Sequence, residues 1–319
     1  MKSPVVLGID LGGTNCRVAQ VTREGAVGKP LRFPTAMDKG FEPFFSRLLE
    51  ACSEIVADAR GEGLKVEALG MGCPGVIGPR GDVVVSPNLP ALNGKPLGRL
   101  LLENLGLKVT VVNDANAIAW GEGTCGAGSE FPSFVAITLG TGVGSGLVLE
   151  GRLWVGPDGT ACEAGHLMVE PEGRPCGCGA RGCLEQYASA SGIVKSVQEA
   201  LSRNVPSLLS QTPSGELTSE RVAEAARRGD RVACSALEEA GRRLGQVFAG
   251  LANLLNLHGA VITGGAAESL DLMRPVMERE LRLRAFDIPA RRLRIVRGTL
   301  GDNAGIIGAA RLALGTSRT

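Results

Sequence analysis

The stretch VVLGIDLGGTNCRVAQV, from Val5 to Val21, decides the architecture expected for this chain. It predicts a strand, a short turn and a second strand, because β-branched residues run up to Gly12 and Gly13 and then resume. Residues 134–150 repeat this plan as FVAIT, LGTGVGSG and LVLE. Strand-like and helix-like segments alternate along the rest of the chain, which indicates an α/β protein.

Both glycine-rich turns suit an anion, because absent side chains let backbone N–H groups approach it and threonine adds a hydroxyl donor. Neither turn is a dinucleotide fingerprint or a P-loop, since strand-like sequence follows each one and no Gly-Lys-Ser/Thr occurs. Either turn alone also fits an ordinary hairpin. As a pair, with Asp10 ending the first strand, they indicate two loops around one polyphosphate, and Asp10 would serve a Mg²⁺ ion through water.

Further segments have clear patterns. They are a helix over residues 41–61, a strand VEALGMGC running into Pro74-Gly75, a buried strand KVTVVN before a helix from Ala115, a helix from the N-cap Asp230 to His258 with Gly259 as its stop, and a strand AVIT before Gly264-Gly265. The strand KVTVVN delivers Asn113 and Asp114 to its carboxyl end, where ligands gather in open α/β sheets. The polar residues 202–219 suit a flexible loop.

A histidine and three cysteines lie within a short segment of the chain, at His166, Cys176, Cys178 and Cys183. Their spacing, with glycine, proline and arginine between them, is typical of a closed tetrahedral zinc site. A loop of free thiols beside an incidental histidine is the alternative, and a disulfide is a weaker one in a chain without a secretory leader. The cysteines at positions 16, 52, 73, 125 and 234 lie apart among small or apolar neighbours, as buried free cysteines do.

Composition excludes several classes of function. In 319 residues, 34 basic side chains nearly balance 33 acidic ones, so neither nucleic acid nor a membrane surface is an expected partner. No apolar run approaches the length of a membrane span, and Asp10 interrupts the first one. We therefore expect a soluble, cytoplasmic protein of two domains.

Six motifs together resemble the ROK family of repressors, open reading frames and sugar kinases. They are Asp10-Leu-Gly-Gly-Thr-Asn15, Cys73-Pro-Gly75, Asn113-Asp114-Ala-Asn116, Leu139-Gly-Thr-Gly-Val-Gly144, Glu163-Ala-Gly-His166 and Cys176-Gly-Cys178-Gly-Ala-Arg-Gly-Cys183-Leu-Glu185. The resemblance implies a two-lobed actin-like ATPase (ribonuclease H-like) fold with an interlobe cleft. It implies a small lobe of residues 1–115 plus 300–319, with a returning C-terminal helix, and a large lobe of residues 116–299 that carries the zinc site.

The resemblance also implies transfer of the ATP γ-phosphate to a hexose, with ATP, Mg²⁺ and structural Zn²⁺ as cofactors. Asp114 matches the catalytic base, although a carboxylate before a helix is also a common N-cap. The residues that match the sugar-contacting set are Asn88, Asn113, Asp114, Glu163, His166 and Glu185. Those that match the phosphate loops and the turn beside the adenosine are Asp10, Gly12, Gly13, Thr14, Thr141, Gly142, Gly264 and Gly265. The zinc ligands are His166, Cys176, Cys178 and Cys183.

Several functions remain open within this family. We expect a glucokinase that phosphorylates the 6-hydroxyl of glucose, and an N-acetylmannosamine, N-acetylglucosamine or other hexose kinase is the alternative. A sugar-responsive repressor would need an N-terminal helix-turn-helix, and only nine residues precede Asp10. A non-catalytic sugar sensor is disfavoured because Asp10, Asp114 and both glycine-rich loops are intact. The family also implies a homodimer or a larger homo-oligomer.

Overall fold

The computed structural model describes residues 4–315 and has an α/β fold of two compact units. The first unit comprises residues up to Ala136, Gly146–Cys162 and the segment from Gly298 onward. The second comprises Ile137–Ser145 and Glu163–Arg297. The predicted α/β class is therefore confirmed, whereas the division of the lobes near residues 115 and 300 stays a proposal.

A five-stranded sheet in the order β3-β2-β1-β4-β7 forms the centre of the first unit. Strands β1, β4 and β7 run parallel, and β2 and β3 are antiparallel additions. The strands of this sheet are β1 (Val5–Leu11), β2 (Asn15–Thr22), β3 (Leu31–Pro34), β4 (Val66–Cys73) and β7 (Lys108–Asn113). A separate two-stranded sheet consists of β5 (Val76–Ile77) and β6 (Val83–Val85). The helices of the unit are α1 (Phe41–Gly61), α2 (Leu97–Leu105), α3 (Asp114–Cys125) and α10 (Ala304–Ala313).

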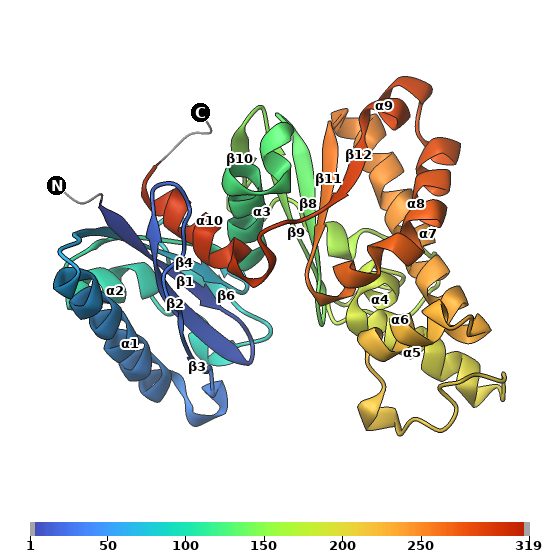
Figure 1. The fold of residues 1–319 in the computed structure, drawn as a ribbon, viewed down its shortest axis with the longest axis horizontal. Helices are drawn as coiled ribbons and strands as arrows, with labels where there is room; N and C mark the ends of the chain where they lie inside the picture. The colour runs from blue at the N-terminus through green and yellow to red at the C-terminus, as the bar shows by residue number, and fades with distance from the viewer. Residues whose placement is uncertain (1–3, 316–319) are drawn as a thin grey trace. The chain divides into compact units, whose positions relative to one another are not determined.

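Side chains of β1 alternate between the two faces of the sheet, so the hydrophobic core of this unit lies on both faces. Leu7 and Ile9 pack into a cluster with Phe44 and Leu48 of α1. Val6 points the other way, into a cluster with Ile306 of α10. Helix α10 packs closely against α3 and lies on the opposite face of the sheet from α1 (Figure 1). The last segment of the chain thus completes the unit that the first segment begins.

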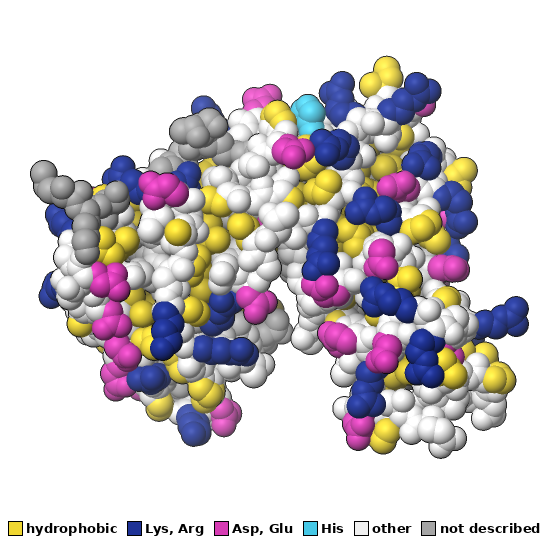
Figure 2. All heavy atoms as spheres, in the orientation of Figure 1, with side chains coloured by type: hydrophobic (Ala, Val, Ile, Leu, Met, Phe, Trp, Pro, Cys, Tyr) yellow, Lys and Arg dark blue, Asp and Glu magenta, His cyan; other side chains and the backbone are white. Residues whose placement is uncertain are grey.

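The second sheet has the strand order β10-β9-β8-β11-β12. Its strands are β8 (Phe134–Leu139), β9 (Val143–Leu149), β10 (Arg152–Trp154), β11 (Gly259–Thr263) and β12 (Arg294–Arg297). The helices of the second unit are α4 (Glu185–Ala188), α5 (Ala190–Ser202), α6 (Ser219–Arg227), α7 (Arg231–Leu255), α8 (Leu270–Arg284) and α9 (Asp287–Arg292). Positive and negative side chains intermingle over these helices on the face that Figure 2 shows, and no patch of one sign stands out there.

Most of the predicted elements are confirmed, and two boundaries were wrong. The helix from the N-cap Asp230 ends at Leu255 instead of His258, because Asn256 adopts a left-handed φ of 51°. The second strand of the second hairpin begins at Val143 instead of Leu147, so its turn is only Gly140-Thr141-Gly142. Within residues 4–315, no helix has the length and apolar character that crossing a bilayer requires.

Candidate functional site

The first glycine-rich turn joins β1 to β2, and two hydrogen bonds hold it in place. The N–H of Gly12 donates to the carbonyl of Asn15 at 2.9 Å, and Thr35 donates from its hydroxyl to the carbonyl of Gly12 at 2.8 Å. Gly13 and Thr14 are exposed, and a Cβ added at Gly13 would have no atom within 4 Å. The turn is therefore ordered, and open space above Gly13 can receive a ligand.

Asp10 lies at the end of β1, opposite Arg17 of β2. A Cβ added at Gly305 would lie 2.8 Å from an oxygen of the Asp10 carboxylate, so the first turn of α10 backs this group. Arg17 binds the same end of α10, because its guanidinium donates to the carbonyl of Asp302 at 2.5 Å and to Oδ1 of Asn303 at 2.8 Å. Burial raises the pKa of the Asp10 carboxyl above its ordinary value; Arg17 opposes this shift, and Asp302 adds to it.

Asn113 and Asp114 lie where β7 ends and α3 begins, and their side chains accept different N–H groups of the helix. Asn113 is the N-cap, since its Oδ1 accepts the N–H of Asn116 at 3.1 Å. Its Nδ2 donates to the carbonyl of Gly75 at 3.1 Å, which ties the Cys73-Pro74-Gly75 segment to this strand end. Asp114 is the first helical residue, and its Oδ1 accepts the N–H of Ala115 at 2.9 Å.

The parallel register brings three of the predicted motifs to one edge of the first sheet. Asp10 pairs with Gly72 of β4, and Cys73 pairs with Asn113 of β7. The carboxyl ends of β1, β4 and β7 therefore lie next to one another, which is where ligands bind in open α/β sheets. Asn88 belongs to the same unit and lies on an exposed turn after β6. Sequence patterns gave no indication of nearby Ser86, whose hydroxyl is buried without a hydrogen-bond partner among the described residues.

The second glycine-rich turn gathers predicted residues of the second unit. Glu185, the first residue of α4, accepts the N–H of Val143 at 3.0 Å. A Cβ added at Gly142 would lie 2.5 Å from the same carboxylate oxygen. Gly264, with φ of 84°, lies so close to the end of β8 that an added Cβ would be 2.6 Å from the carbonyl oxygen of Leu139. Gly265 follows it and begins a short 3₁₀ helix, Gly265–Ser269.

Glu163 precedes a single 3₁₀ turn, Ala164–His166, that rests on β9 and ends with His166. The N–H of Ala164 donates to Oγ of Ser145 at 2.9 Å, and a Cβ added at Gly165 would lie 2.2 Å from the carbonyl oxygen of Val143. Both Glu163 and His166 are exposed. The structure thus brings Thr141-Gly142, Glu163, His166 and Glu185 to the start of β9.

The predicted zinc ligands form one cluster, in which all four ligand atoms lie within 4.8 Å of one another. His166 Nδ1 is 3.6 Å from Sγ of Cys176, and the sulfurs of Cys178 and Cys183 are 3.7 Å apart, which is no disulfide. Burial, together with hydrogen bonds to neighbouring thiols, raises the pKa of Cys183 to about 12. The N–H of Ala180 and the thiol of Cys176 lower the pKa of the Cys178 thiol. The thiolate is the form of cysteine that binds metals, so the contacts of Cys178 favour metal binding.

Known proteins resemble this chain over nearly its full length. A glucokinase of Thermotoga maritima is 34% identical over 312 residues, which cover 96% of each chain. The crystal structure of a ROK family glucokinase from Streptomyces griseus, in complex with glucose and AMPPNP, matches with a TM-score of 0.81 and 34% identity over 98% of this chain and 100% of that one. A ROK family transcriptional regulator, a homologue of the E. coli protein MLC, matches with a TM-score of 0.88 and 27% identity over 98% of this chain and 78% of that one.

A family profile also matches nearly the whole chain. The ROK family profile matches residues 6–316, and these include the strand-end edge of the first unit and both glycine-rich turns. With this match and a relative that is 34% identical over nearly the full length of both chains, the chain belongs to the ROK family.

Proposed function

We propose that the protein is an ATP-dependent glucokinase that transfers the γ-phosphate of ATP to the 6-hydroxyl of glucose. The observation that carries this proposal is the shared edge of the first sheet, where Asp10, the Gly75 segment and the Asn113-Asp114 pair meet. The likeness to two glucokinases at 34% identity supports the same reaction. Another hexose kinase, such as one for N-acetylmannosamine or N-acetylglucosamine, would use the same kind of edge.

A sugar hydroxyl is a poor nucleophile, so a base must accept its proton as the bond to phosphorus forms. We assign this role to Asp114. Asn113 satisfies the start of α3 as its N-cap, so the Asp114 carboxylate is not required for that task. Asn88, Asn113, Glu163, His166 and Glu185 are the proposed partners of the sugar hydroxyls, because amide, carboxylate and imidazole groups pair with such hydroxyls and exclude sugars that leave them unpaired.

The phosphates of ATP are assigned to the two glycine-rich turns. In the first unit, Gly13 and Thr14 offer backbone and hydroxyl donors, and Gly12 closes the turn through its own N–H bond to Asn15. In the second unit, Thr141 and Gly142 offer such donors. Gly264 and Gly265 form the proposed turn beside the adenosine. Asp10 is the residue that would hold Mg²⁺, through water, and the ion would neutralise charge on the transferring phosphoryl group.

The His166 cluster is proposed as a structural zinc site. With Zn–S bonds of about 2.3 Å and a Zn–N bond of about 2.0–2.1 Å, a tetrahedral ion separates two sulfurs by about 3.8 Å and a sulfur from a nitrogen by about 3.6 Å. The corresponding separations in this cluster are 3.7 Å and 3.6 Å. Since Nδ1 of His166 faces the cluster, its Nε2 remains for the sugar.

We also propose a cytoplasmic homo-oligomer, in keeping with the family resemblance. A cluster of exposed apolar side chains supports a contact between subunits. It consists of side chains at the ends of α7 and α8 and the start of α9, at Leu254, Leu283, Phe286 and Ile288.

A coupled assay of ADP formation against glucose, mannose, fructose, N-acetylglucosamine and N-acetylmannosamine tests the function. We expect kcat/KM for glucose to exceed that for either N-acetyl sugar by about tenfold, a difference that modest changes in a pocket can supply. An N-acetyl sugar in first place would replace glucose as the substrate and leave the kinase assignment intact. No ADP formation with any hexose would contradict the kinase assignment itself.

A further inference from the structure

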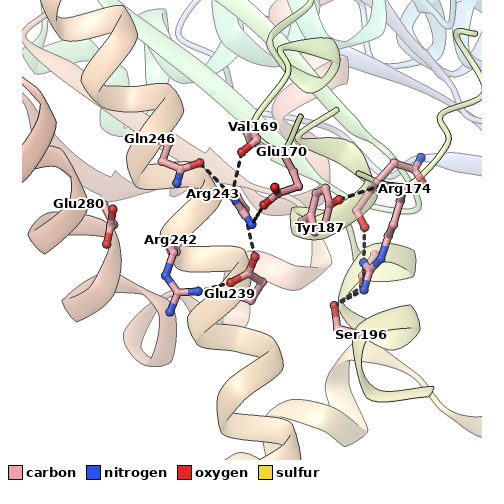
Figure 3. Close-up of polar contacts among 12 residues, drawn as sticks. Val169, Glu170, Arg174, Tyr187, Ser196, Glu239, Arg242, Arg243, Gln246 and Glu280 are labelled. Carbon is pink, nitrogen blue, oxygen red and sulfur yellow. Dashed lines mark hydrogen bonds and ion pairs between the residues drawn. The ribbon is translucent and has the colours of Figure 1, made fainter. Parts of the chain in front are cut away.

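The single tyrosine of the chain, Tyr187, lies beside two arginines from different parts of the second unit. The guanidinium carbon of Arg174 is 4.8 Å from the centre of the Tyr187 ring, and that of Arg243 is 5.3 Å from it. Figure 3 shows Tyr187 between the two arginines. Planar guanidinium groups stack on aromatic rings and are attracted by their π-electrons. We name these three residues the arginine–tyrosine clamp.

Residues 167–183, which carry the three clustered cysteines, form the cysteine loop. Arg174 connects this loop to α4 and α5. Its Nη1 donates to the carbonyl of Gln186 at 2.5 Å, and Nε and Nη2 form a two-pronged contact with Glu199 at 3.1 and 2.7 Å. Nη2 also donates to the hydroxyl of Ser196 at 3.0 Å. The backbone N–H of Arg174 donates to the Tyr187 hydroxyl at 3.0 Å. Arg174 lies two residues before Cys176, so these contacts fix the chain where it enters the cysteine cluster.

Arg243 connects the other part of the same loop to α7. Its Nη1 donates to the carbonyl of Val169 at 2.7 Å, and Nη2 forms an ion pair with Glu170. Its Nε donates to Glu239, one turn earlier on α7, at 2.7 Å. Val169 lies three residues after His166. The clamp therefore holds the segment between His166 and Cys176 near both of its ends.

The clamp borders a cavity and is nevertheless largely buried. Arg174, Tyr187, Glu199 and Glu239 line a cavity of about 610 Å³, so protein atoms do not fill this side. The side chains of Arg174 and Arg243 are nevertheless only 13% exposed. Hydrogen bonds, ion pairs and ring contacts hold both guanidinium groups in addition to this burial.

The clamp ends next to a proposed sugar-binding residue. Gln186 and Tyr187, which Arg174 contacts, directly follow Glu185 in α4. Because α4 has only four residues, its backbone cannot fix its own orientation through many helical hydrogen bonds. We propose that the arginine–tyrosine clamp positions Glu185 and the cysteine loop for sugar binding, and that it does so without help from the metal. This proposal rests on the proposed function for its substrate.

Paired variants of the holoenzyme test the clamp. Tyr187→Leu removes the ring, whereas Tyr187→Phe removes only the hydroxyl and keeps both stacked contacts. Arg243→Met breaks the second contact, and Arg242→Met is its control, because Arg242 is the adjacent arginine of α7, pairs with Glu239 and makes no contact with Tyr187. The measurements are glucose affinity by calorimetry, zinc content by elemental analysis, and the split between KM and kcat.

We expect Tyr187→Leu and Arg243→Met to retain zinc and to bind glucose about tenfold more weakly, the scale for losing one desolvated cation–π contact and its hydrogen bonds. KM should rise more than kcat falls. Arg242→Met should stay within about threefold of wild type. Tyr187→Phe should lose less affinity than Tyr187→Leu, because it keeps the ring contacts and loses only the bond from the Arg174 N–H. Wild-type affinity in a zinc-retaining Tyr187→Leu protein would overturn the proposal, as would a loss of affinity that only follows loss of zinc. If Tyr187→Leu does not fold, the comparison of Arg243→Met with Arg242→Met decides.

Hydrogen exchange separates failure of the clamp from failure of the assigned function. The backbone amides of residues 185–188 should exchange faster in Arg243→Met than in Arg242→Met, with zinc bound in both. Equal exchange would overturn the clamp whatever the substrate. If wild type binds no hexose but the exchange difference holds, the assigned function fails and the clamp stands as a support of α4.

Discussion

Replacing Asp114 by asparagine separates catalysis from helix capping. An asparagine Oδ1 can still accept the N–H of Ala115, as the Asp114 Oδ1 does at 2.9 Å, and the cap of α3 belongs to Asn113. The free energy of unfolding should therefore change by less than about 1 kcal/mol. Glucose and ATP affinities should stay within a few-fold. Turnover should fall by about 10² or more, because an amide cannot accept the proton of the sugar hydroxyl.

The magnitude follows from the chemistry of one group. A hundredfold loss of kcat corresponds to about 2.7 kcal/mol of transition-state stabilisation. Asn113→Ala is the structural comparison, since it removes the N-cap and should cost about 1 kcal/mol of stability. It also removes the bond from Nδ2 to the carbonyl of Gly75, so its glucose affinity should fall as well. The two variants thus have opposite profiles, one losing turnover and the other losing stability and binding.

Steady-state kinetics, calorimetry and urea unfolding of both variants decide the matter. If Asp114→Asn kept near-normal turnover, Asp114 would serve only the start of α3, and the base would have to be another group. A large loss of stability in Asp114→Asn would equally refute the division of tasks between Asn113 and Asp114.

Three other predictions follow from the same structure. Purified protein should contain about one zinc per chain, and Cys178→Ser should release it, because structural ligands form one closed shell; elemental analysis that finds no zinc in the wild type would contradict this. Gly13→Val should weaken ATP binding far more than glucose binding in calorimetry, because its side chain would enter the open space above the turn and meets no protein atom there; equal losses would indicate a misfolded hairpin. Glu122→Gln should lower the free energy of unfolding by about 1–3 kcal/mol in urea titrations, because the two oxygens of the fully buried carboxylate accept the N–H groups of Thr299 and Leu300, and glutamine keeps only one acceptor oxygen; an unchanged midpoint would refute this account.

Local patterns predicted the elements whose ends are set by local chemistry. The helix Phe41–Gly61 and the strands Val66–Cys73 and Lys108–Asn113 have the bounds expected from sequence, because glycines or a polar pair end each apolar run. The end of α7 differs because Asn256 adopts a left-handed conformation, so the helix stops before the glycine that would have ended it. The start of β9 differs because Val143 and Ser145 are held by Glu185 and Ala164, which are distant in sequence.

Local sequence patterns also predict only part of the candidate site. The strand-end position of Asn113 and Asp114 could be predicted, since a buried strand before a helix places its last residues at one edge of the sheet. The spacing of His166, Cys176, Cys178 and Cys183 also predicted their cluster. Contacts of Tyr187 with Arg243 have no such pattern, because the two residues lie 56 positions apart and arginine is common on exposed helix faces. Only the fold brings them together.

The contacts around Glu185 also show what the proposed zinc can and cannot control. Its carboxylate accepts the N–H of Val143, its carbonyl accepts the hydroxyl of Ser189 at 2.7 Å, and Arg174 holds the next residue along the chain. None of these three bonds involves a cysteine side chain, and the N–H of Gln186 meets the cluster only through the backbone carbonyl of Cys183, at 3.0 Å. His166, in contrast, is exposed and its ring faces the cluster through Nδ1, so its orientation depends on the ligands around it. Loss of the metal should therefore misplace His166 first and leave Glu185 in position, which makes the loss of sugar affinity in Cys178→Ser partial.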